Sequence, residues 1–131
     1  MTDVNKIDES FRKRVVVLGA SNKPERYSNK AIHMLREKGF EVIPIHPKLT
    51  EIEGIPVVAN LSDVQVPFHT MTLYVGPQRS EPMVEALIQS KPQRVIMNPG
   101  TESDLLKSKF EEAGIEVVFG CTLVMLQTGY F

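Results

Sequence analysis

The sequence has little of what secreted, metal-binding and membrane proteins need. It contains one cysteine, Cys121, in 131 residues, so an intrachain disulfide is impossible and a cysteine-based zinc site has too few ligands. No apolar run approaches the roughly 18 residues that a membrane-spanning helix requires. The amino-terminal stretch MTDVNKIDESFRKR lacks the apolar core of a signal peptide. These absences favour a cytoplasmic protein in a reducing compartment.

The chain also lacks an excess of charge of either sign. Its 15 lysines and arginines stand against 16 aspartates and glutamates, which gives a formal net charge of −1. This balance gives no support for nucleic acid or a membrane as the main partner. The hydrophobic content of 42% is enough for the core of one domain of this length. We therefore expect a single folded domain whose partner is a small molecule.

Short β-branched runs alternate with segments of helical periodicity. The pattern predicts strands at 14–19, 40–45, 71–75, 94–97 and 115–119, and helices at 27–38, 80–90 and 103–113. A short extended piece at 55–57 and a helical turn at 61–64 are expected in the less regular segment between them. Repeated strand–helix units require right-handed crossovers. The sequence thus predicts a Rossmann-like three-layer α/β/α domain with a mostly parallel five-stranded sheet over residues 14–131, preceded by an arm over residues 1–13.

Some local features carry their own expectations. Ser28 and Asn29 are the predicted N-cap residues of the first helix. Pro44 lies within a predicted strand, where proline is tolerated best at a sheet edge. His33 is expected to be a partly buried helix residue. The apolar segment 123–131 is expected to pack on the domain or to cover a subunit contact, which makes a homodimer an expectation as well.

The turn after the first strand is the main candidate for a ligand site. Parallel α/β sheets bind ligands at the carboxyl ends of their strands, where the strand order reverses. Gly19 permits a tight turn there, and the small residues Ala20 and Ser21 permit close approach of a ligand. The next helix offers free N–H groups and a positive dipole end, and Lys23 and Arg26 add charge. The turn suits a phosphate or pyrophosphate, although Gly-Ala-Ser is also common in purely structural turns.

This turn differs from the dinucleotide fingerprint. Ser21 and Pro24 occupy the positions of the second and third glycines of that fingerprint. The second strand ends in His46-Pro47-Lys48 rather than in the acid that holds the ribose of NAD. A lysine at that position favours a ribose that carries an extra phosphate. NADP and coenzyme A both have one, so the chemistry leaves both open. An interaction domain that has lost its ligand is a third hypothesis.

The stretch VVVLGASNKPERYSNKAIHMLREKGFEVIPIHPK resembles the opening of the small coenzyme A (CoA)-binding proteins. Their pattern is an apolar strand, Gly-Ala-Ser, Lys-Pro-Glu-Arg, a helix, a glycine, and a strand that ends in a Pro-Lys turn. The chain is also similar to the CoA-binding domain of succinyl-CoA synthetase, without the phosphohistidine segment or the grasp domain of that enzyme. The resemblance implies a module that binds CoA or an acyl-CoA.

The resemblance also implies a role for each of the site residues. It places the pyrophosphate at Gly19, Ala20, Ser21 and Lys23, in a loop that continues through Pro24 and Arg26. The adenosine and its ribose phosphate are expected at His46, Pro47 and Lys48. The far side of the cleft is expected at Val75, Gly76 and Pro77, and the pantetheine near Asn98, Pro99 and Gly100.

No catalytic or metal-binding residue is predicted. Ser21 has no evident base, and no acid lies near His46 in the sequence to orient it. The three histidines show no metal-ligand spacing. Cys121 follows the last strand and is expected to be a small, semi-buried residue at the edge of the cleft. We therefore expect binding without catalysis.

Overall fold

The computed structural model describes residues 10–131, so most of the predicted arm lies outside the described residues. The strands are β1 (Arg14–Leu18), β2 (Glu41–Ile45), β3 (Glu51–Ile52), β4 (Ile55–Pro56), β5 (Thr70–Leu73), β6 (Arg94–Met97) and β7 (Glu116–Phe119). The α-helices are α2 (Tyr27–Glu37), α3 (Pro77–Ser80), α4 (Val84–Gln89), α5 (Asp104–Glu112) and α6 (Thr122–Thr128), and the 3₁₀ turns are η1 (Leu61–Asp63) and η2 (Glu81–Met83). Within residues 10–131, no helix has the length and apolarity needed to cross a bilayer.

Five strands form one parallel sheet in the order β2-β1-β5-β6-β7, which confirms the predicted Rossmann-like α/β fold. The chain leaves β1 for β2 on one side and later returns to pair β5 on the other side. The carboxyl ends of β1 and β5 therefore border the point where the strand order reverses. Pro44 lies in the edge strand β2, as expected.

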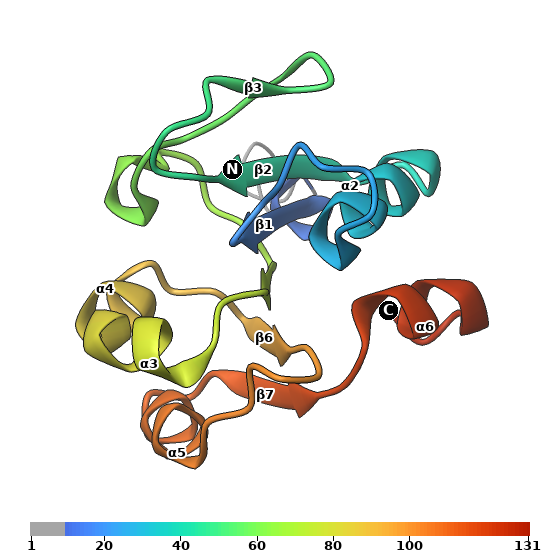
Figure 1. Ribbon diagram of the computed structural model, residues 1–131. Helices are drawn as coiled ribbons and strands as arrows, with labels where there is room; N and C mark the ends of the chain where they lie inside the picture. Colours follow the sequence, from blue (N-terminus) through green and yellow to red (C-terminus); the bar gives the residue numbers. More distant parts are fainter. Residues whose placement is uncertain (1–9) are drawn as a thin grey trace, which may run out of the picture.

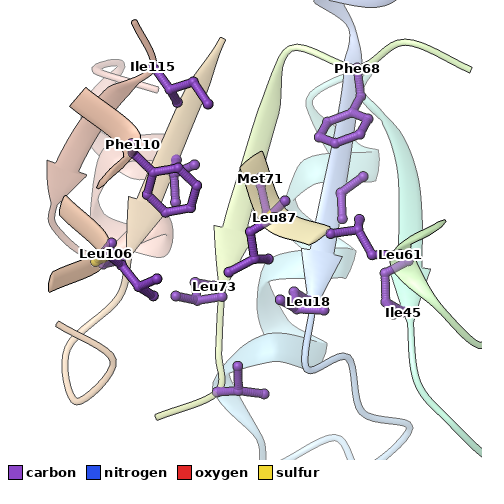
Figure 2. Close-up of a cluster of buried hydrophobic side chains, with 14 residues drawn as sticks. Leu18, Ile45, Leu61, Phe68, Met71, Leu73, Leu87, Leu106, Phe110 and Ile115 are labelled. Atoms are coloured by element: carbon purple, nitrogen blue, oxygen red, sulfur yellow. The ribbon is translucent and has the colours of Figure 1, made fainter. Parts of the chain in front are cut away.

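Each face of the sheet has its own hydrophobic core. On one face, alternate strand residues pack against side chains from η1, α4 and α5, including the buried Leu61, Leu87 and Phe110 (Figure 2). On the other face, Val15 and Val17 pack with Ile32 of α2 and Leu126 of α6. Figure 1 shows α3, α4 and α5 on one side of the sheet and α2 and α6 on the other. Successive strand residues point to opposite faces, which is why both faces must be covered.

Two helix predictions need correction. The helix predicted at 80–90 begins earlier, at Pro77, and is divided into α3, η2 and α4, because Pro82 has no N–H to donate to the preceding turn. The predicted caps Ser28 and Asn29 are wrong as well. Arg26 is the N-cap residue of α2, it makes no side-chain capping hydrogen bond, and Ser28 and Asn29 are buried within the first turn.

The apolar carboxyl-terminal segment does pack back on the domain, as a helix that its composition did not reveal. Helix α6 lies against α2, Leu126 is buried in the core between them, and the ring of Phe131 lies 4.6 Å from the guanidinium carbon of Arg94. Val124 remains 52% exposed. A homodimer stays a prediction.

Removal of the Phe110 ring should strongly destabilise the folded protein. Its side chain is fully buried between α5 and the sheet, so Phe110→Ala should lower the free energy of unfolding by about 3–5 kcal/mol. Leu105→Ala on the same helix removes a side chain of a residue that is 47% exposed and serves as the control. Urea denaturation checks both variants, and equal losses would contradict this description of the core.

Candidate functional site

The first element of the site is the close approach of β1 and β5 at Gly19. Gly19 has φ = +91°, a conformation that other residues rarely adopt. A Cβ atom at this position would lie 2.9 Å from Cγ1 of Val75 and 3.0 Å from the carbonyl carbon of Tyr74. Glycine therefore lets the chain turn away from β1 while the end of β5 passes beside it.

A short, hydrogen-bonded loop follows Gly19 and leads into α2. The N–H of Ala20 donates to the carbonyl of Ile45 (3.2 Å), which ties the loop to β2. The hydroxyl of Ser21 accepts from the N–H of Lys23 (3.1 Å). The carbonyl of Ser21 accepts from Nδ2 of Asn29 in α2 (2.9 Å). These bonds fix the loop between the end of the sheet and the start of the helix.

The same loop presents backbone donors that no described residue uses. Among residues 10–131, the N–H groups of Ser21, Asn22, Tyr27 and Ser28 have no hydrogen-bond acceptor. The first turn of α2 contains no acidic residue of its own, so no carboxylate within that turn offsets the positive end of the helix dipole. Free N–H groups that converge at the start of a helix form an anion-binding arrangement.

These groups line a cleft of about 700 Å³ at the carboxyl ends of the strands. Its lining includes the cationic residues Lys23, Arg26 and Arg79 together with His46, and no aspartate or glutamate from residues 10–131. In a chain with a net charge of −1, this is a local concentration of positive charge. The cleft therefore favours an elongated anionic ligand with apolar parts, because Leu61, Val75 and Met83 line it as well.

The cleft brings together most of the residues that the sequence singled out. Those that line it are Gly19, Ala20, Ser21, Lys23, Arg26, His46, Pro47, Val75 and Pro99. Those that do not are Pro24, Lys48, Gly76, Pro77, Asn98 and Gly100. Lys48 is exposed, and both neighbours, Pro47 and Leu49, line the cleft. Lys48 thus lies beside the cleft without lining it, and its role at the ribose phosphate stays a prediction.

Asn98 lies inside the protein, where it joins β5, β6 and α6. Its Nδ2 donates to Oγ1 of Thr72 (2.7 Å) and to the carbonyl of Leu73 (2.8 Å). Its Oδ1 accepts from the N–H of Thr122 (2.9 Å), and the hydroxyls of Thr72 and Thr122 are 2.7 Å apart. The Asn98 amide is thus occupied by neighbouring residues and holds the start of α6 against the sheet.

His46 is likewise engaged by its own turn. Its Nδ1 accepts from the N–H groups of Lys48 and Leu49, both at 3.0 Å. Because Nδ1 is an acceptor in both bonds, the proton of the neutral ring lies on Nε2. Neither ring nitrogen is then a free base, so His46 closes the turn after β2 while it lines the cleft.

The sequence did not reveal several lining residues. These are Tyr27, Ser28, Leu49, Ala59, Asn60, Leu61, Tyr74 and Met83. The segment Ala59–Leu61 reaches the cleft through the bridge between Ile45 and Val58, a long-range contact that no local pattern encodes. Asn22, Arg79 and Thr101 also line the cleft, and each follows the carboxyl end of a strand, where parallel α/β sheets are expected to bind ligands.

Tyr74 forms part of the cleft wall beside this buried network. Burial raises the pKa of its phenol to about 12, while hydrogen bonds to the side chains of Thr122 and Thr72 act in the opposite direction. The phenol is therefore a neutral hydrogen-bonding group at neutral pH. Cys121, the N-cap residue of α6, is partly buried nearby.

Comparison with known proteins agrees with this geometry. The family model "CoA binding domain" matches residues 13–127. A crystal structure of an uncharacterized protein shares 38% identity and a TM-score of 0.85, covering 92% of this chain and 98% of the other. The uncharacterized protein YneT of Bacillus subtilis (strain 168) is 22% identical over 81% of this chain and 78% of its own.

A larger enzyme contains a domain of the same fold. The apo structure of the dinucleotide-forming acetyl-coenzyme A synthetase 1 of Ca. Korarchaeum cryptofilum has a TM-score of 0.69 and 18% identity, covering 85% of this chain and 27% of the enzyme. At this identity the likeness concerns the fold alone.

The raised pKa of Tyr74 should affect stability at high pH. Between pH 10.0 and about 12, the phenol ionises in the unfolded chain but stays protonated in the folded one, so the free energy of unfolding should fall as the pH rises. This contribution is fully present below pH 10. Tyr74→Phe should show a shallower decline in urea denaturation across this window. Identical slopes for the two proteins would contradict the assignment.

Proposed function

This chain belongs to the family of CoA-binding domains, and we propose that its cleft binds coenzyme A or an acyl-CoA without catalysing a reaction. The observation that carries the proposal is the composition of the cleft. The residues that line it include four with unused backbone N–H groups and the cationic residues Lys23, Arg26 and Arg79, and no acidic residue among residues 10–131. CoA is an anion of matching form, with a pyrophosphate, a ribose phosphate and a long uncharged arm.

Each part of CoA has residues suited to hold it. The N–H groups of Ser21, Asn22, Tyr27 and Ser28 suit the pyrophosphate, because they lie at the positive end of α2. Lys48 lies in the turn after β2, next to cleft-lining residues, and would pair with the ribose phosphate. The apolar side chains of Leu61, Val75 and Met83, which also line the cleft, suit the pantetheine arm.

The contacts of the polar side chains support binding without catalysis. The hydroxyl of Ser21 accepts a backbone hydrogen bond, and no histidine or acid of the described residues is bonded to it. The ring of His46 is held as an acceptor by two amides. General-base catalysis needs a free nitrogen or carboxylate within reach of the reacting proton, and the cleft lining offers none among the described residues.

Ligand selectivity tests the proposal directly. CoA should raise the melting temperature of the protein in a thermal-shift panel, and dephospho-CoA at the same concentration should raise it less, because a ligand that binds more tightly stabilises the fold more. NAD, NADP and ATP complete the panel. A shift with NADP but none with millimolar CoA would replace the proposal with an NADP-binding protein, and no shift with any nucleotide would point to an interaction domain.

The contribution of Arg79 can be measured separately. Arg79→Ala should weaken CoA binding roughly three- to tenfold in calorimetric titration, because an exposed cation adds a modest, salt-screened attraction to an anion. Lys109→Ala removes an equal charge from α5, outside the residues that line the cleft, and should leave the dissociation constant unchanged. Equal effects of both variants would mean that only the net charge of the chain matters.

A further inference from the structure

The β3–β4 hairpin lies outside the five-stranded sheet, beyond the edge strand β2 (Figure 1). Ile52 pairs with Ile55, so Glu53 and Gly54 form a two-residue turn. Glu53 has φ = +51° and Gly54 has φ = +85°. Asparagine, aspartate and glycine are the usual residues at the first position of such a turn, and the left-handed conformation is strained for glutamate. The presence of glutamate calls for an explanation beyond the turn itself.

The carboxylate of Glu53 binds two side chains of α2. Its Oε2 lies 2.6 Å from Nε2 of His33 and accepts from Nδ2 of Asn29 at 3.2 Å. The backbone carbonyl of Glu53 accepts from Nη1 of Arg36 at 3.5 Å. Ile52, the preceding residue, is fully buried. The sequence predicted a partly buried His33, but 51% of its side chain is accessible to solvent. The residue instead serves as a partner for the carboxylate of Glu53 in the hairpin.

Asn29 connects this contact to the cleft. It is 1% exposed, and its Nδ2 donates both to Glu53 and to the carbonyl of Ser21. Its Oδ1 has no partner among the described residues. The orientation of the amide thus depends on two acceptors that face the same nitrogen, one of which is the carboxylate of Glu53.

The bond to Ser21 also sets the direction of a backbone donor. In a trans peptide the C=O and the following N–H point in opposite directions, and the described chain contains no cis peptide. Because the Ser21 carbonyl points at Asn29, the N–H of Asn22 points away from it. That N–H is one of the unused donors of the cleft-lining loop.

We propose that Glu53 is a positioning residue for the cleft, which acts through Asn29 to hold the Ser21–Asn22 peptide in the orientation that binds an anion. The inference rests on the proposed function of the cleft as a CoA site. Glu53 itself lies outside the cleft lining. Since coupling between two sites is reciprocal, a ligand bound to the loop should also stabilise the docked hairpin.

The test compares substitutions that separate the turn from its carboxylate. Glu53→Gly keeps the turn, because glycine adopts φ = +51° without strain, but it removes the contact with Asn29. It should weaken CoA binding about tenfold in calorimetric titration, the loss expected for one hydrogen bond to a charged group. Glu53→Gln keeps an acceptor for Asn29 and should restore most of the affinity. Glu51→Gln removes the same charge from the same hairpin and should bind like the wild type.

Hydrogen exchange gives a second readout that needs no ligand. In ligand-free Glu53→Gly, the amides of residues 20–26 should exchange faster than in the wild type and in Glu51→Gln, because the loop loses its support. In the wild type, added CoA should slow exchange at residues 51–56. Asn29→Ala should reproduce the binding loss, and the double variant should lose little more than either single variant.

The outcomes separate the two proposals. If the wild type binds no CoA, the proposed function fails, and the exchange of residues 20–26 still decides whether Glu53 supports the loop. If the wild type binds CoA and Glu53→Gly binds equally well with unchanged loop exchange, Glu53 only shapes the turn and the inference is overturned. Additive losses from Asn29→Ala and Glu53→Gly would also overturn it, because the two residues would then act independently.

Discussion

The absence of a side chain at Gly19 is the constraint on which the site depends. The chain must leave β1 so close to β5 that even a methyl group would meet Val75 and the backbone of Tyr74. This approach brings the loop after β1, the end of β5 and the turn after β2 around one space. A larger residue would have to move the loop away from the sheet edge, and the unused N–H groups of the loop would then no longer face the same space as Arg79.

Two kinds of polar residue meet at this edge of the sheet, and they do different things. Asn98 and Thr122 use their hydrogen bonds on neighbouring elements and fix α6 to the sheet. The loop from Ser21 to Ser28 leaves several of its backbone donors unused. Buried polar groups are normally paired, as those of Asn98 and Thr122 are. The free donors of the loop lie mostly in residues that are at least partly exposed to solvent, so they are available to a ligand.

The sequence predicted the elements whose signals are local and missed those that depend on distant contacts. The parallel strands and α2 follow from β-branched runs, helical periodicity and the glycine at position 39. The extended piece expected at 55–57 overlaps β4. Its pairing with β3 and the helix α6 were missed, because both depend on packing against α2 that no short pattern records. In the site, the loop after β1 was predictable because glycine and small residues mark it. The inward orientation of Asn98 was not, since an asparagine after a strand looks the same whether it faces a ligand or the core.

The unused donors between Ser21 and Ser28 belong to the main chain, and this has a consequence for how such a site can evolve. Every residue except proline carries the same N–H group, so substitutions along the loop can accumulate without deleting these donors, provided that the backbone path is kept. Selection would then act on the few positions that fix the path, while the side chains around them remain free to diversify. Related domains can in this way inherit a binding geometry even after their sequences have become hard to align.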